Sequence, residues 1–177
     1  MREQCLFILI LVTVFWIGFG EGFRLEEIEK TAKQCCAASK TQCCVDMMKF
    51  GRPVRCGYEK SAEWVEILYN CVQRGLLSSD QQMPLYDGYC CQVFAKDSTD
   101  SSNQCERTCK LTMQSPSLDK TERFEKIRKC STVENPLNQC FHNCLKLRKD
   151  GISTQVLEFS EYCNYTAPTK STQLHFN

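Results

Sequence analysis

The chain has 177 residues, fifteen of them cysteine, and its 22 basic and 21 acidic side chains leave a formal net charge of +1. This near balance argues against nucleic-acid binding and against a basic surface that seeks membranes. Cysteine at this density is typical of small extracellular proteins that are held together by disulfides.

The first segment of the chain is apolar. Arg2 precedes an apolar run over residues 6–19, and small and polar residues follow at 20–22. This run has the length of a signal-peptide core, whereas a membrane-spanning helix needs about 20 apolar residues, so an uncleaved anchor is the less favoured alternative. We expect residues 1–22 to be removed together with Cys5, which leaves a secreted protein in an extracellular, oxidising compartment.

Fourteen cysteines remain after this removal, an even number that predicts up to seven disulfides of unknown pairing. They are Cys35, Cys36, Cys43, Cys44, Cys56, Cys71, Cys90, Cys91, Cys105, Cys109, Cys130, Cys140, Cys144 and Cys163. Neighbouring Cα atoms lie about 3.8 Å apart, which is short for a disulfide, so each doublet is expected to bridge to two other segments. The C-x-x-C spacing of zinc and redox sites is absent, and we predict neither a metal site nor a cofactor.

The cysteines fall into two groups, and they predict two modules. The first module covers residues 23–73 and the second covers 90–163, with a connection at 74–89 and a polar tail at 164–177. Glycine, proline, serine and aspartate in the connection are typical of a surface segment. Its apolar side chains could form a binding patch, but we favour their burial between the modules; they are Leu76, Leu77, Leu85, Tyr86 and Tyr89.

Hydrophobic periodicity predicts a helix that ends the first module. Trp64, Ile67, Leu68 and Cys71 recur at helical spacing, so we expect them to form one buried stripe, with Trp64 packed against disulfides. The alternative is a Trp64 that faces a ligand.

A second helix is predicted after Pro116. Asp119 can cap it and Glu122 stands three residues further on, which is the spacing of a capping box. Phe124 and Ile127 share one face, and the mixed charges of residues 120–129 predict a solvated face.

Two C-x3-C motifs predict further helices. Cys105 and Cys109, and likewise Cys140 and Cys144, would each place two thiols one helical turn apart. We hypothesise that the two pairs cross-link an antiparallel helical hairpin. Short strands remain possible at 45–58 and 151–160. The fold class predicted is therefore mainly α, small and disulfide-rich, with two tandem helical modules.

The sequence offers few residues for catalysis. The part after the apolar run contains two histidines, His142 and His175, and the first lies between two cysteines. Secreted phospholipases also have a cysteine doublet, but a His-Asp pair follows theirs and none follows Cys91. We therefore predict that the protein is not an enzyme. Asn164 begins an Asn-x-Thr acceptor, which predicts surface glycosylation in a secreted chain.

The cysteine spacing from Cys90-Cys91 through Cys105, Cys109, Cys130 and Cys140 resembles the cysteine-doublet repeat of the reversion-inducing cysteine-rich protein with Kazal motifs (RECK). Residues 65–71, which end at Asn70-Cys71, and the following doublet resemble the junction between two such repeats. The resemblance spans about residues 35–144. It implies tandem helical repeats that serve as extracellular binding modules, without Kazal modules or a lipid anchor.

The function predicted from these features is that of a secreted binding protein whose partner is an extracellular or cell-surface protein, with no insertion into a membrane after signal cleavage. A secreted protease inhibitor is the alternative, with 74–88 or 92–104 as its exposed loop. A secreted hydrolase is a more remote one.

Overall fold

The computed structural model describes most of the chain between residues 25 and 163. The described ranges are 25–97, 100, 102–130, 136–151 and 159–163. The predicted signal peptide, the glycosylation acceptor Asn164, His175 and the polar tail lie outside these ranges.

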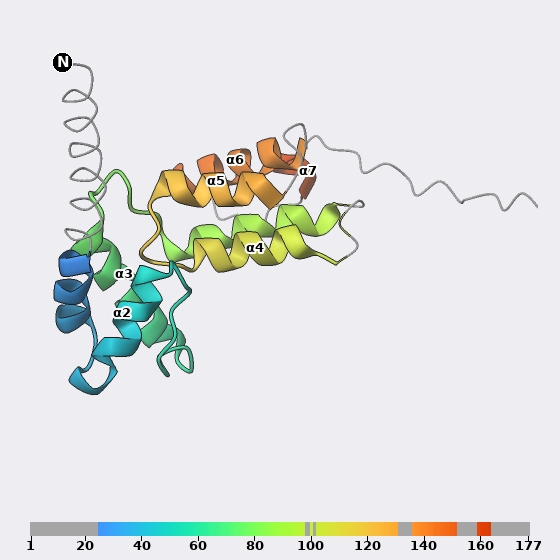
Figure 1. Cartoon of the computed structure of the whole chain (residues 1–177). Coiled ribbons are helices and arrows are strands. Elements are labelled where there is room, and N and C mark those ends of the chain that lie inside the picture. The colour runs from blue at the N-terminus through green and yellow to red at the C-terminus, as the bar shows by residue number, and fades with distance from the viewer. Residues whose placement is uncertain (1–24, 98–99, 101, 131–135, 152–158, 164–177) are drawn as a thin grey trace, which may run out of the picture.

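The first half of the fold is a cluster of helices at the N-terminal side (Figure 1). Its elements are a helix over residues 25–35, the 3-10 helix η1 (Ala38–Lys40), α2 (Thr41–Lys49) and α3 (Ala62–Leu76). Their inward side chains form one hydrophobic core, in which Val45, Met48, Leu68 and Val72 are buried.

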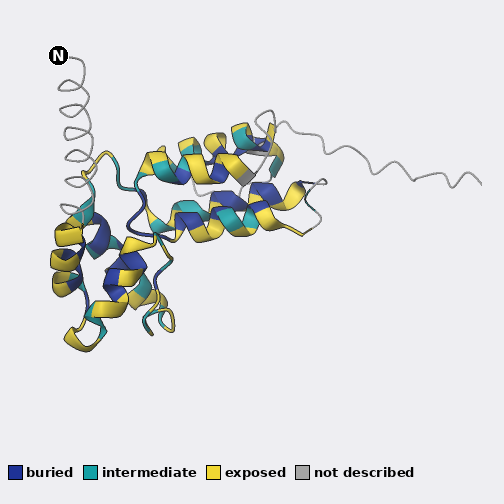
Figure 2. Ribbon diagram, in the orientation of Figure 1, coloured by how far each residue is buried: buried dark blue, intermediate teal, exposed yellow. Residues whose placement is uncertain are grey.

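The second half is a longer helical body. It contains η2 (Leu85–Lys96), α4 (Gln104–Met113), α5 (Lys120–Cys130), α6 (Pro136–Lys149) and the short α7 (Phe159–Tyr162). Helix α4 packs against both η2 and α5, while α6 packs against η2, so these four elements lie side by side (Figure 1). Each of these helices has buried residues on the side that faces the others and exposed residues on its outer side (Figure 2).

Local capping explains where two of the helices begin. The Ser61 side chain accepts a hydrogen bond from the Trp64 amide at 3.4 Å and caps α3. At the start of α5, the Glu122 amide donates to Asp119 Oδ1 at 2.8 Å and the Asp119 amide donates to Glu122 Oε2 at 3.2 Å. The predicted capping box is therefore confirmed, and these bonds satisfy amides that a helix leaves without partners.

Six disulfides hold the described part of the chain together. The pairs are Cys35–Cys71, Cys36–Cys44, Cys43–Cys56, Cys90–Cys144, Cys91–Cys109 and Cys140–Cys163. Each pair lies within one half, and the members of every doublet bond to different segments. Cys105 is buried on α4, and Cys130 ends α5 with its side chain outside what is described.

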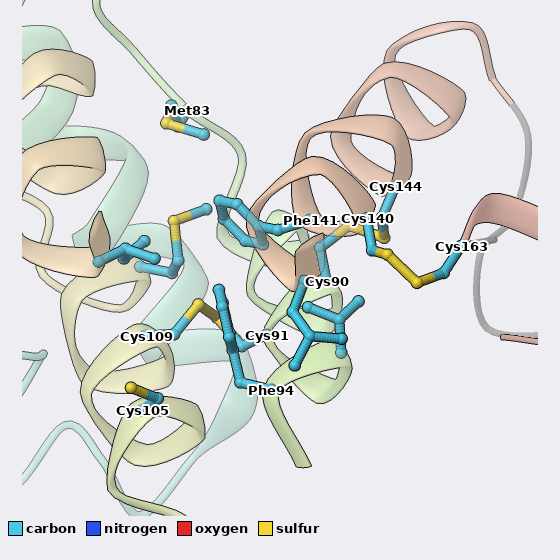
Figure 3. Close-up of a cluster of buried hydrophobic side chains, with 14 residues drawn as sticks. Met83, Cys90, Cys91, Phe94, Cys105, Cys109, Cys140, Phe141, Cys144 and Cys163 are labelled. Atoms are coloured by element: carbon cyan, nitrogen blue, oxygen red, sulfur yellow. A yellow bond between two sulfur atoms is a disulfide. The ribbon is translucent and has the colours of Figure 1, made fainter. Parts of the chain in front are cut away.

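The C-x3-C motifs lie on helices α4 and α6 as predicted, but the hairpin cross-link is wrong. Cys109 bonds to Cys91 and Cys144 bonds to Cys90, so both helices are attached to η2. Because η2 lies between them, its doublet reaches a cysteine on each side. Figure 3 shows this region, in which the rings of Phe94 and Phe141 pack 5.7 Å apart among the disulfides.

The described residues form helices, turns and irregular segments, and no strand occurs among them. The possible strand at 45–58 is wrong, since residues 45–49 belong to α2 and turns follow. Residues 152–158 of the other possible strand lie outside the described ranges, and residue 159 begins α7. The predicted mainly α, disulfide-rich fold is confirmed.

A buried polar network joins the two halves. The Arg123 guanidinium, fully buried on α5, donates to the Tyr69 hydroxyl of α3 at 2.5 Å, to the Leu118 carbonyl at 2.8 Å and to the Ser115 carbonyl at 2.8 Å. The predicted solvated face of α5 is therefore wrong at Arg123. The side chain can be buried because backbone carbonyls and a phenol satisfy its donors.

Gln73 extends this junction. Its amide exchanges two hydrogen bonds of 2.8 Å with the backbone of Met83, which is buried in the second core. The Tyr69 hydroxyl lies 3.0 Å from the same Met83 carbonyl and 2.9 Å from that of Met113. Burial raises the pKa of Tyr69 above its usual value. Residues 77–84 are thereby fastened to α3 at Met83.

Candidate binding surface

Helix α3 presents two large apolar side chains to solvent. Trp64 is 54% exposed and Ile67 is 48% exposed. Their predicted burial is therefore wrong, although Leu68 of the same stripe is buried. Tyr69 and Gln73 turn inward instead because their polar ends find partners at Met83. The buried face of α3 thus carries Tyr69 and Gln73 beside Leu68 and Val72, and Trp64 and Ile67 lie outside it.

Trp64 is held by neighbours from an earlier segment. Its ring packs 6.4 Å from the ring of Tyr58, and Lys40 Nζ lies 4.1 Å from the Tyr58 ring centroid. The Tyr58 hydroxyl accepts a hydrogen bond from the Ala37 amide at 2.9 Å. These contacts fix an aromatic pair at one end of the exposed face of α3.

Two tyrosines of η2 continue this face on the other side of α3. The Tyr86 hydroxyl donates to Glu66 Oε2 at 2.5 Å, and Arg148 lies over the Tyr89 ring, 5.7 Å from its centroid. Tyr86 and Tyr89 are 45% and 46% exposed, so their predicted burial between the modules is wrong. Leu76 and Leu85 are partly buried against the first core, and Leu77 is partly buried.

We refer to Tyr58, Trp64, Ile67, Tyr86 and Tyr89 as the aromatic strip. Tyr58 packs on Trp64 of α3, Ile67 follows Trp64 by one turn, and Tyr86 of η2 contacts α3 at Glu66, with Tyr89 at the η2 end. Tyrosine and tryptophan are enriched where proteins bind one another, because they combine a large apolar area with few rotatable bonds. The arrangement supplies a surface for contact with another macromolecule.

Sequence reasoning identified two parts of this strip and misjudged both. Tyr86 and Tyr89 were considered as a patch, and a ligand-facing Trp64 was considered as an alternative. The signal that was available is a second apolar line at helical spacing on α3, formed by Val65, Leu68, Val72 and Leu76, which faces the first core. Tyr58, in contrast, gave no local sign of its contact with Trp64.

The other predicted positions add no chemical site. His142 is exposed on α6, with its ring 5.2 Å from that of Phe124. Partial burial, together with the charge of Lys120, lowers its pKa below the usual value. Over the residues that the structure describes, no group of three or more His, Cys, Asp and Glu side chains could hold a metal ion. Within the same part, no helix combines the length and apolar character needed to cross a bilayer.

The fold and the strip define a class of protein: a small, helical, disulfide-stapled chain with an exposed aromatic surface and the disulfide content of extracellular proteins. The family model described as Caenorhabditis elegans Her-1 matches residues 24–167, and the chain belongs to this family. The chain is 40% identical to Protein her-1 of Caenorhabditis elegans over 166 residues, which cover 92% of this chain and 95% of that protein. It is also similar to the crystal structure of C. elegans HER-1, with a TM-score of 0.73, 42% identity and coverage of 78% of this chain and 98% of that one.

The resemblance to the RECK repeats is therefore wrong. The Her-1 model matches residues 24–167 as a whole, whereas the resemblance depended on cysteine spacing and the short segment that ends at Asn70-Cys71. The number of residues between cysteines depends on the lengths of the helices that the disulfides connect, so unrelated helical, disulfide-rich folds can share the same spacing.

Proposed function

We propose that the protein is a secreted ligand that binds an extracellular or cell-surface protein through the aromatic strip, and that it acts without catalysing a reaction. The observation that carries the proposal is the exposed Trp64, which packs against Tyr58 on a helix that the Cys35–Cys71 disulfide attaches to the first half. A preorganised aromatic surface binds at low entropic cost, because little ordering is needed when the partner arrives. The six disulfides support a secreted location, since such bonds persist in oxidising compartments.

The alternative of a protease inhibitor gains less support. Inhibition of this kind needs an extended exposed loop, but residues 74–76 and 85–96 are helical. Residues 77–84 remain of the first candidate loop, and this segment is bonded to Gln73 through Met83. Residues 98, 99 and 101 of the second candidate loop, 92–104, lie outside the described ranges. We therefore favour surface binding over insertion of a loop into an active site.

A cell-surface binding assay tests the proposal. Trp64→Ser and Tyr89→Ser are compared with Phe50→Ser, which alters a side chain that is 55% exposed and lies outside the strip. Purified, oxidised protein is added to living cells of the organism that encodes it, and specific binding is the part displaced by excess unlabelled wild type. Circular dichroism and migration without reductant check that each variant is folded.

We expect Trp64→Ser to lower the affinity about 30-fold, as loss of a central aromatic residue of about 2 kcal/mol would do. Tyr89→Ser should lower it less, because Tyr89 lies at the end of the strip. Phe50→Ser should retain the wild-type affinity. Full binding by the folded Trp64→Ser variant, or an equal loss with Phe50→Ser, would contradict the assignment to the strip.

A further inference from the structure

A second surface feature lies next to the strip. Two adjoining hollows occur beside α6, and they share Phe124 and His142 as lining residues. The one nearer the strip has a volume of about 510 Å³ and is bounded by α6, the start of α5 and residues 79–84. We refer to this hollow as the lysine pocket.

The lining of the lysine pocket combines apolar and basic side chains. Met83, Pro84, Phe124 and Leu145 supply apolar side chains. Three exposed lysines also line it, namely Lys120, Lys146 and Lys149. A ligand in this pocket would therefore meet apolar surface and positive charge together.

The charge of the lysine pocket is not cancelled by its acidic residues. Asp87 lies 3.3 Å from Arg148 Nε, so this carboxylate and this guanidinium balance one another. Asp80 is the other acidic lining residue, whereas three lysines line the same pocket. The excess of positive charge indicates an anionic ligand, whose carboxylates would pair with exposed lysines.

The pocket and the strip are connected. Arg148 lines the pocket and also lies over the ring of Tyr89 at the end of the strip. Asp87, which pairs with Arg148, follows Tyr86 directly in η2. One partner that covers the strip could therefore extend a segment into the pocket.

We propose that the lysine pocket binds an acidic peptide segment of the protein partner, with one apolar side chain of that segment against Phe124 and its carboxylates against the three lysines. This proposal rests on the proposed function and names the chemistry of the partner. A peptide fits better than a sulfated sugar chain, because the pocket offers apolar area that an apolar side chain would bury. The ring of His142, 5.2 Å from that of Phe124, adds aromatic surface to the same lining.

A nuclear magnetic resonance titration of the folded, oxidised protein tests this inference. The probe is an eight-residue peptide of Asp and Glu with one central Phe, acetylated and amidated at its ends. One matched peptide carries Asn and Gln in place of the acids, and a second carries Ser in place of Phe. A heparin-derived octasaccharide tests the sugar alternative.

We expect the acidic Phe peptide to shift the ring signals of His142, with an affinity that falls as salt is added. Both matched peptides should bind at least fivefold more weakly. The triple variant K120Q/K146Q/K149Q should lose at least tenfold in affinity, which is consistent with several exposed charge pairs of modest strength. Its control is K30Q/K33Q/K60Q, which removes the same charge from exposed lysines of the first half.

Three results would overturn the inference: no shift at His142, an equal loss in both triple variants, or tighter binding of the octasaccharide than of the acidic peptide. Trp64→Ser separates this inference from the proposed function, because it should leave peptide affinity unchanged while it lowers the affinity for cells about 30-fold. Binding to cells that survives K120Q/K146Q/K149Q in full, together with absent peptide binding, would reject the pocket and leave the strip intact.

Discussion

The substitution Tyr69→Phe tests the buried junction between the two halves. It removes one hydroxyl and keeps the ring, so the change in packing is small. Arg123 Nη1 then loses its bond of 2.5 Å and keeps only the Met113 carbonyl at 3.4 Å. The Met83 carbonyl, in contrast, retains the bond of 2.8 Å from the Gln73 amide.

The bond that the hydroxyl donates to a carbonyl is lost as well, but the Met83 and Met113 carbonyls each keep another donor, so the main cost is the hydrogen bond to the buried guanidinium. Such a bond contributes about 1.5–3 kcal/mol, so we expect a loss of about 2 kcal/mol in the free energy of unfolding. For a chain of this length, about 2–4 °C of melting temperature are lost per kcal/mol, which gives a decrease of about 4–8 °C.

Thermal unfolding followed by circular dichroism, with the disulfides intact, measures this decrease. Tyr86→Phe is the matched control, because it makes the same change at an exposed tyrosine and should alter the free energy by less than about 0.5 kcal/mol. A melting temperature for Tyr69→Phe equal to that of Tyr86→Phe would refute the role given to the junction. A double-mutant cycle with Arg123→Lys should show that the two losses are not additive, since the two side chains are in direct contact.

Three further outcomes are expected. Asp119→Ala should cost about 1 kcal/mol in chemical denaturation by removing the α5 cap, and an unchanged midpoint would contradict the capping role. Gly51→Ala should lower the free energy of unfolding by about 1–3 kcal/mol in the same assay, because the glycine has φ +55° and an added Cβ would lie 2.6 Å from Leu118 Cδ2. An equal or higher stability would show that Leu118 moves aside without cost. The pKa of His142, followed by magnetic resonance, should lie below 6.5. The free energy of unfolding should decrease as the pH falls through this folded pKa, because the unfolded chain then binds the proton more tightly than the folded protein does. A His142→Gln variant should remove that part of the pH dependence, and a pKa at or above 6.5 would reject it.

The capping box of α5 and the helical C-x3-C motifs could be predicted from the sequence. Both depend on residues three or four positions apart, and such neighbours meet on a helix whatever the rest of the chain does. The disulfide-rich class of the fold was equally accessible, since it follows from the number of cysteines and their doublets. The same local information misled the comparison with RECK, because spacing alone does not distinguish helical folds that carry similar bridges.

Only the tertiary structure decided which side of each helix is buried. The sequence placed Trp64 in the core and Arg123 in solvent, and both positions are reversed. The reason is one set of contacts between distant residues: Tyr69 and Gln73 on α3 meet Met83, and Arg123 on α5 meets Tyr69. These bonds make burial of the polar groups favourable, and Trp64 and Ile67 of α3 lie in solvent while Leu68 and Val72 pack in the core. The amino-acid sequence alone thus determined the helices and the disulfide-rich class. Hydrogen bonds between residues 10 to 54 positions apart in the chain determined how the two halves meet and which side chains are left on the surface that we propose as the binding site.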